Sequence, residues 1–265
     1  MLKIYQRLWQ VTWAEQWQYR ANLLMYQLYW LVSPVVYLSI WVAIANNQGS
    51  VKGLTANDFI TYYLTLLIID QITSEITIHI FAYKIQDGTL SGDLLRPIHP
   101  ILTGALVTNI AFKVLSLLAF IPAWVVLLFL FRPDYGNVTF TSILLAIPGI
   151  LLGFWINFLL GAMIACMAFW TTRVYSISQF FYLVIILLSG QFVPLQLMPP
   201  VIQNIASYLP FQMFRYVPVE TILNRMPIDT LIRDYAICLV WLVVFHFLFR
   251  WIWREGIKRF SAVGA

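Results

Sequence analysis

Six long apolar runs dominate this chain and limit what it can fold into. They cover residues 24–45, 59–82, 101–131, 141–170, 174–194 and 232–253. A helix needs about 20 residues to cross the ~30 Å hydrocarbon core of a bilayer, so each run is long enough to span a membrane. Because 61% of the residues are hydrophobic and only 10% are charged, the sequence predicts an all-α integral membrane protein with six transmembrane helices.

The distribution of Lys and Arg predicts how these spans are oriented. Ten of the cations lie at the termini and in the even-numbered loops, and five, including Arg215 and Arg225, lie in the odd-numbered loops. Positive charge is retained on the cytoplasmic side, so both termini and the loop at 84–100 are predicted to be cytoplasmic. Lys113 lies inside the third run, and we expect its side chain to snorkel to the interface. The cations gather at span ends rather than on one face, which argues against nucleic-acid binding.

Residues 1–20 are amphipathic rather than apolar. At helical spacing Tyr5, Trp9 and Trp13 share one face, and Lys3 and Arg7 lie on the other. Such a pattern predicts an interfacial helix, with its rings at headgroup depth and its cations toward anionic lipid. This helix is either a simple membrane anchor or part of a contact with a partner.

Two polar or broken segments lie between the spans. The loop at 84–100 holds two glycines, two prolines and balanced charges, which cannot lie in hydrocarbon, so we expect it to meet a soluble partner. The segment at 195–214 is moderately apolar but is broken by Pro199, Pro200 and Pro210. It predicts an external re-entrant hairpin, with a plain external loop packed on the bundle as the alternative.

The second run is the most polar of the six. Gln71, Glu75 and His79 are spaced to lie on one face of a continuous helix, with Asp70 and Ser74 on an adjacent stripe. Ionisable groups are costly when they face lipid, so an interior or water-filled position is expected. This face lines a substrate pathway, forms hydrogen bonds between helices, or relays protons through Asp70 or Glu75, and the sequence leaves these alternatives open.

The fourth run carries a stripe of small residues at every fourth position. Its members are Gly149, Gly153, Asn157, Gly161 and Ala165. This spacing predicts a helix face that lets another backbone approach closely, and it carries no information about chemistry.

Motifs for enzymatic chemistry are absent from the sequence. It has no glycine-rich phosphate loop, no metal-ligand spacing and no nucleophile motif, and both cysteines, Cys166 and Cys238, lie inside apolar runs. The chain itself is therefore not expected to be an enzyme, and any ATP hydrolysis must occur in another polypeptide. Two alternatives remain: an intramembrane enzyme that uses Glu75 and His79 as an acid–base pair, and a passive channel or structural membrane subunit.

Two segments in this order resemble the ABC-2 type transporter permeases, and most closely a small bacterial subfamily of paired permeases. The first is Asp87-Gly88-Thr89-Leu90-Ser91-Gly92-Asp93-Leu94-Leu95-Arg96-Pro97, and the second is Gly190-Gln191-Phe192-Val193-Pro194-Leu195 with Met198-Pro199-Pro200 and Leu209-Pro210-Phe211. The resemblance covers residues 1–265 as a single transmembrane domain.

This resemblance implies an exporter of the bacterial plasma (inner) membrane that works by alternating access. Two permease subunits, either two copies or a heterodimer of related chains, would combine with two separate ABC ATPase subunits. ATP and Mg²⁺ would bind in the partner ATPase, and this chain would carry no cofactor.

The resemblance also implies roles for particular residues. A coupling helix in the loop at 84–100 would contact the ATPase through Gln86, Asp87, Thr89, Leu90, Asp93, Leu94 and Arg96. The substrate pathway would be bordered by Asp70, Ser74, Glu75, Ser178, Gln179 and Tyr182. The hairpin would form an extracellular gate that includes Phe192, Pro194, Pro199 and Pro200.

Overall fold

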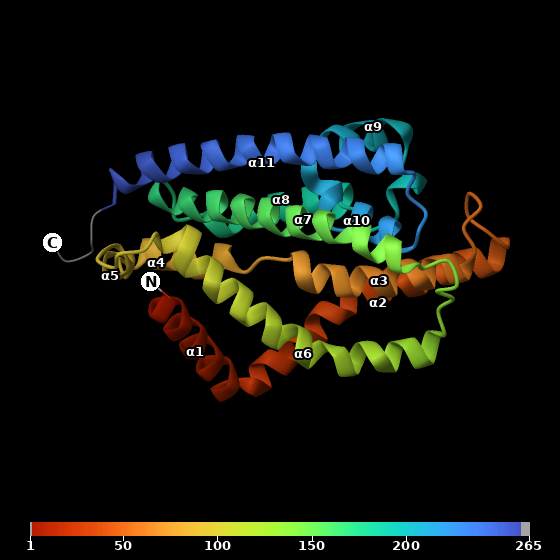
Figure 1. Cartoon of the computed structure of the whole chain (residues 1–265), viewed down its shortest axis with the longest axis horizontal. Helices are drawn as coiled ribbons and strands as arrows, with labels where there is room; N and C mark the ends of the chain where they lie inside the picture. The colour runs from red at the N-terminus through yellow and green to blue at the C-terminus, as the bar shows by residue number, and fades with distance from the viewer. Residues whose placement is uncertain (1, 261–265) are drawn as a thin grey trace.

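The computed structural model describes residues 2–260, and this part of the chain folds into helices joined by short loops (Figure 1). The apolar runs form these helices: α2 (Arg20–Gln48), α3 (Ala56–Thr73), α4 (Thr77–Gln86), the π-helical turn η1 (Pro100–Ala105) with α6 (Leu106–Phe131), α7 (Phe140–Cys166) with η2 (Met167–Phe169), α8 (Val174–Leu188) and α11 (Ile228–Ile257). Between them lie α1 (Leu2–Gln18), α5 (Leu90–Leu94), η3 (Leu195–Leu197), α9 (Pro200–Tyr208), η4 (Pro210–Phe214) and α10 (Tyr216–Ile222). The predicted all-α class is confirmed for the described residues.

Four of these helical segments, within the described residues, are long and apolar enough to cross a membrane: α2, η1 with α6, α7 with η2, and α11. The protein is therefore a multi-pass membrane protein. The second predicted span is not one helix, because it is interrupted between α3 and α4. The fifth corresponds to α8, whose 15 residues are fewer than the roughly 20 that a straight crossing needs. Six crossings remain a prediction.

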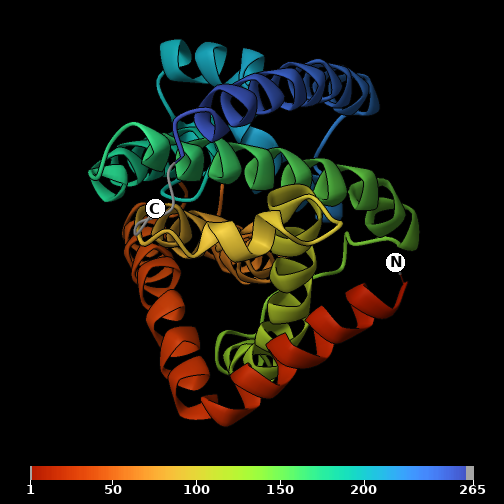
Figure 2. The same cartoon turned by 90° about the vertical axis from the view of Figure 1, so that its left-hand side faces the viewer.

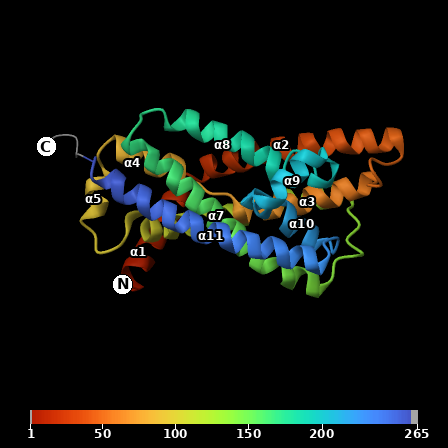
Figure 3. The ribbon, with the colours of Figure 1, turned by 90° about the horizontal axis from the view of Figure 1, so that it is seen from above.

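The elements divide between two ends of an elongated molecule. The start of α1, the short helix α5 and the last turns of α11 lie at one end in Figures 1 and 3, and α9 and the end of α2 lie toward the other. The beginning and the end of the described chain therefore lie at the same end as the loop at 84–100. An even number of crossings produces this arrangement.

The N-terminal helix α1 forms where the amphipathic pattern predicts it. It ends at a bend near Tyr19, from which α2 turns back into the bundle (Figure 2). The helix packs against α6, and the rings of Trp9 and Trp13 stack with their centroids 5.8 Å apart. Its place in the membrane interface stays a prediction.

A buried ion pair connects α3 to the segment after η4. The Arg215 Nη2 atom lies 2.6 Å from Asp70 Oδ1, and the two side chains are 4% and 7% exposed. The guanidinium also donates through Nη1 to Ser189 Oγ at 3.2 Å. Arg215 lies in the connection between the fifth and sixth runs, as the sequence predicts, but it is not an exposed charge, because the planar guanidinium is held inside the protein by an acid on α3.

The segment predicted as a hairpin folds into short helices that pack on the bundle. Pro200 and Pro210 occupy first turns, α9 and η4 respectively, where proline removes no needed donor. Every residue of η4 is buried. Thr73 Oγ1 donates to the Phe214 carbonyl at 2.7 Å and so ties the end of η4 to α3. Whether this segment faces the outside stays a prediction.

The small-residue stripe on α7 permits close contacts, as predicted, but with three partners rather than one helix. A Cβ added to Gly149 would lie 2.9 Å from the Tyr235 ring on α11. A Cβ on Gly153 would collide with the Met213 carbonyl oxygen in η4, and one on Gly161 would collide with the Glu75 carboxyl group. The stripe is therefore the surface on which the irregular segments of the bundle rest.

We expect Asp70→Ala to lower the free energy of unfolding by about 3–5 kcal/mol, because it leaves the buried Arg215 charge without its partner. Replacing both residues by Leu and Met should restore most of the loss. Thermal unfolding in detergent measures both. Lys258→Ala breaks an exposed pair and is the control. If Asp70→Ala lowers the free energy of unfolding no more than Lys258→Ala does, the buried Asp70–Arg215 ion pair is contradicted.

Gly153→Ala tests the packing of η4 on α7. The added methyl group meets a backbone oxygen that cannot rotate away, so we expect a loss of about 1–3 kcal/mol, typical of overpacking. Gly104→Ala is the control, because a Cβ there has no neighbour within 4 Å. Equal stability of the two variants, measured by the same thermal unfolding, would contradict the close approach.

Candidate functional site

The second apolar run is interrupted at residues 74–76, between α3 and α4. A broken helix inside a membrane protein needs partners for its freed backbone groups. Glu75 supplies one, since its Oε2 accepts a hydrogen bond from the Thr77 backbone N–H at 2.6 Å. The Thr77 hydroxyl in turn accepts from Asn109 Nδ2 on α6 at 3.2 Å. The start of α4 is therefore held from its own chain and from α6.

Side chains of two other helices satisfy the end of α3. Asn157 Nδ2 on α7 donates to the Thr73 carbonyl at 2.9 Å. Lys113 Nζ on α6 donates to the Gln71 carbonyl at 3.2 Å and to Ser74 Oγ at 3.1 Å. The break is therefore a defined feature with polar partners on both sides.

Two predictions from the sequence are corrected here. The continuous polar face through Gln71 and Glu75 does not exist, because the break separates the two residues and changes the helical register. The His79 side chain, the third member, lies outside the described part of the structure. The snorkelling prediction for Lys113 is also wrong, since its ammonium group reaches inward to carbonyl and hydroxyl oxygens of the break.

A small cavity of about 80 Å³ lies beside the break. Four of the six predicted pathway residues line it: Ser74, Glu75, Ser178 and Tyr182. Asp70 and Lys113 line a second, smaller cavity, and Ser74 borders both. Gln179 is exposed on α8. The structure therefore brings α8 and the break together around one cavity and places Asp70 of α3 at another, and the transport role of these residues stays a prediction.

The loop at 84–100 is ordered by a turn at its tip. Asp87 Oδ1 accepts hydrogen bonds from the Thr89 backbone N–H at 3.0 Å and from its hydroxyl at 2.7 Å. These bonds stabilise the carboxylate and hold the pKa of Asp87 below its usual value. The turn leads directly into α5.

A three-residue charge cluster fastens α5 to α4. Asp93 Oδ2 lies 2.7 Å from Lys84 Nζ, and its Oδ1 lies 3.0 Å from Arg96 Nη1. Gln86 Nε2 donates to the Thr172 carbonyl at 3.3 Å, which ties the loop to the turn between α7 and α8. The loop is thus joined to the bundle at two points.

The loop presents a different set of side chains from the predicted one. Those that are exposed, as a contact with a partner requires, are Gln86, Asp87, Thr89, Leu94 and Arg96. Leu90 is completely buried and supports the loop from inside, so its side chain is not available to a partner. Leu95 was missed although it is 88% exposed. The signal was the pair Leu94-Leu95, because adjacent residues point to different sides of a short helix.

The predicted gate residues lie in and after the turn that follows α8. The Phe192 ring packs edge-on against Tyr37 with centroids 5.3 Å apart, and its carbonyl accepts from the Tyr63 hydroxyl at 2.8 Å. Pro194 is buried, and Pro199 and Pro200 are exposed at the start of α9. Figure 3 shows α9 far from α5 along the molecule. Their role as a gate stays a prediction.

Residues 31–264 match the profile of a family described as ABC-2 family transporter protein. The chain belongs to the ABC-2 transporter family. The resemblance read from its motifs is therefore confirmed, and this ABC-2 protein is a membrane component of an ABC transporter rather than a catalytic enzyme. No curated protein matches the chain.

The turn at Asp87 gives a pH-dependent test of the loop in this ABC-2 protein. Since the pKa of Asp87 is lowered, the turn is at full strength above the ordinary pKa of the group and is lost as the pH falls through the lowered value. Thr89→Ala removes the hydroxyl donor, so we expect the pKa of Asp87 to rise toward its ordinary value. Carboxyl ¹³C NMR titration in micelles measures this, with Glu255, which bonds to Lys258, as the internal reference. An unshifted Asp87 in the variant would contradict the turn.

Proposed function

We propose that this ABC-2 protein is the permease subunit of an ATP-binding cassette exporter. In this proposal separate ATPase subunits bind the loop at 84–100 and hydrolyse ATP with Mg²⁺, and this chain binds no cofactor. The observation that carries the proposal is the geometry of α4. This helix ends at the exposed loop and begins at the break, where the small cavity lies.

The break makes α4 suited to transmit a movement. Because residues 74–76 are not helical, a force on α5 tilts α4 without bending α3, as in hinge motions where a few terminal residues absorb the change. The charge cluster of Lys84, Asp93 and Arg96 joins α5 to α4, so the loop and the helix move as one body. Driving the change requires ATPase subunits that bind the two conformations with different affinity.

The surface of the loop indicates which side chains contact the ATPase. We assign Gln86, Asp87, Thr89, Leu94 and Arg96 to this contact because they are exposed, and we add Leu95 as its apolar anchor.

Two predicted residues change their assignment. Asp93 orients the loop through its two ion pairs. Leu90 is left out of the contact because it is buried.

A second permease subunit, a copy of this chain or a related one, completes the pathway in our proposal. Ser178 and Tyr182 line the cavity from α8, and this helix carries exposed apolar side chains, including Phe180 and Leu183. The gate residues Phe192, Pro194, Pro199 and Pro200 would close the pathway at the end opposite the loop. We place the protein in the bacterial inner membrane with both termini and the loop cytoplasmic, as the distribution of positive charge favours.

Leu95→Asp tests the coupling role. Loss of an apolar anchor that is buried at an interface costs about 2 kcal/mol or more of binding free energy, so we expect binding of the ATPase to weaken by roughly thirtyfold. Transport-linked ATP hydrolysis should be lost in parallel. The yield of membrane-inserted protein should be unchanged, because Leu95 is exposed in this chain. Copurification of the ATPase and hydrolysis by the complex are the measurements.

Two comparisons make this experiment specific. Leu95→Met keeps an apolar side chain and should retain binding. Leu90→Asp places a charge in the core and should reduce the amount of folded protein. Full hydrolysis in Leu95→Asp would overturn the contact, and a wild-type protein that purifies without any ATPase would favour a passive channel or a structural subunit.

A further inference from the structure

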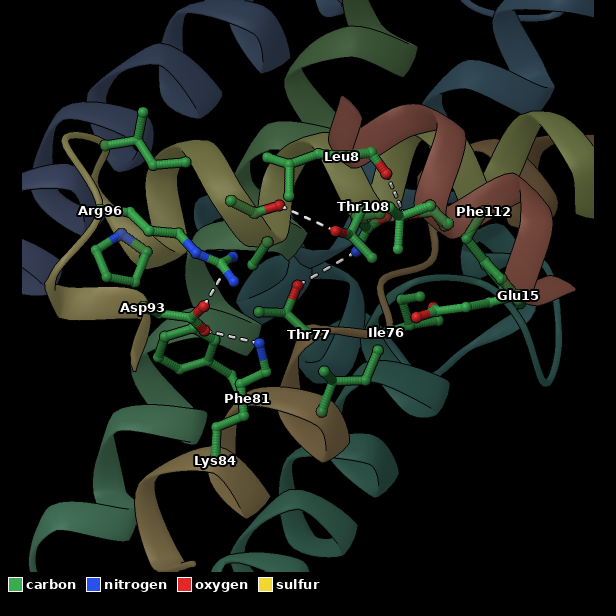
Figure 4. Close-up of a pocket in the computed structure, with 18 of the residues that line it drawn as sticks. Leu8, Glu15, Ile76, Thr77, Phe81, Lys84, Asp93, Arg96, Thr108 and Phe112 are labelled. Carbon is green, nitrogen blue, oxygen red and sulfur yellow. Dashed lines mark hydrogen bonds and ion pairs between the residues drawn. The ribbon is translucent and has the colours of Figure 1, made fainter. Parts of the chain in front are cut away.

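A cavity of about 360 Å³ extends from the loop end of the molecule to Ile76 at the break. It is enclosed by α1, α4, α5 and the start of α6 (Figure 4). This volume is within the range of small-molecule sites in proteins. The proposed coupling uses the charge cluster on one side of this cavity but not the space itself, and none of the proposed pathway residues lines it.

One side of the cavity is positively charged. Lys84 and Arg96 both pair with Asp93, so two positive charges meet one negative charge. The Lys84 and Arg96 side chains are still 37% and 55% exposed, and each has further N–H donors beyond the one engaged. This side can therefore accept an anion such as a phosphate group.

The opposite side carries a carboxylate. Glu15 of α1 lines the cavity across from the cluster of Arg96 and Asp93 (Figure 4). Its side chain has no hydrogen-bond or ion-pair partner among the residues that the structure describes. A free carboxylate at this position can bind an ammonium group.

The wall between the two charged sides is partly polar and partly apolar. Asn109 is 1% exposed, and its Oδ1 atom has no hydrogen-bond partner in the described chain, although its Nδ2 donates to Thr77. Phe81 and Phe112 supply apolar surface. A ligand with polar groups at the two sides and apolar substituents fits this lining.

We propose that this cavity binds the headgroup of a phospholipid that carries both a phosphate and a primary amine, as phosphatidylethanolamine does. The phosphate lies at Lys84 and Arg96, and the ammonium group lies at Glu15. A lipid rather than a soluble phosphate ester is favoured because exposed apolar side chains line the same cavity. Val11 of α1 is 53% exposed and Ile80 of α4 is 44% exposed, and both are suited to contact acyl chains.

This headgroup assignment predicts different affinities for three common phospholipids. A choline headgroup has no N–H to donate to Glu15. A glycerol headgroup has hydroxyl donors but no positive charge to pair with that carboxylate. Of the three, only the ethanolamine headgroup offers Glu15 both a positive charge and N–H donors.

Native mass spectrometry of the full-length, delipidated protein in detergent tests this assignment. The probes are phosphatidylethanolamine, phosphatidylcholine and phosphatidylglycerol with identical short acyl chains. We expect the ethanolamine lipid to bind about tenfold more tightly than the other two. Glu15→Gln and Arg96→Gln should each reduce that affinity by about tenfold, whereas Glu255→Gln and Arg254→Gln, which alter the same residue types outside the cavity, should not.

Three results would overturn the proposal. Equal affinity for the three lipids, or an unchanged preference in Glu15→Gln, would show only general lipid contact. Displacement of the lipid by soluble phosphoethanolamine at the same concentration would show that the acyl chains contribute nothing and that the ligand is soluble. Glu15 is exposed, so the variant is expected to fold. The measurement needs no ATPase and is independent of the proposed export function.

Discussion

The rest of the structure depends on how the break between α3 and α4 satisfies its backbone. In a low-dielectric environment a free carbonyl or N–H costs several kcal/mol, so an interrupted helix survives only where other groups bond to it. Here Asn157 of α7 and Lys113 of α6 bind the end of α3, and Glu75 binds the start of α4. The stripe on α7 makes this possible, since a side chain at Gly161 would occupy the place of the Glu75 carboxyl group.

Two ion pairs also connect α3 to a distant segment of the chain. Asp70 pairs with Arg215, and Asp58, which also caps the first turn of α3, pairs with Arg225 at 2.5 Å. Both cations come from the segment after α9, so this segment is held to α3 at two points about three helical turns apart. Charges that resemble loop charges in the sequence thus hold this segment to α3, which in our proposal is the fixed side against which α4 moves.

The sequence predicted some parts of the site and missed others for identifiable reasons. The polar character of residues 70–77 and the exposure of Asp87 follow from composition and local turn chemistry. The break at residues 74–76 contains neither proline nor glycine, so no local signal marks it, and its partners come from helices far along the chain. The burial of Leu90 and the exposure of Leu95 depend on how α5 lies against the bundle, which spacing alone does not determine.

The sequence by itself determined that the chain is a multi-pass helical membrane protein and which family it belongs to. These properties depend on length, hydrophobicity and local motifs, which neighbouring residues specify together. Only the tertiary structure decided that Arg215 is buried against Asp70, that Lys113 reaches the break, and that α1 encloses a cavity with α4 and α6. Such contacts join residues from separate helices, so they exist only once the helices have packed, and each buried polar group then takes the partner that the packing brings within reach.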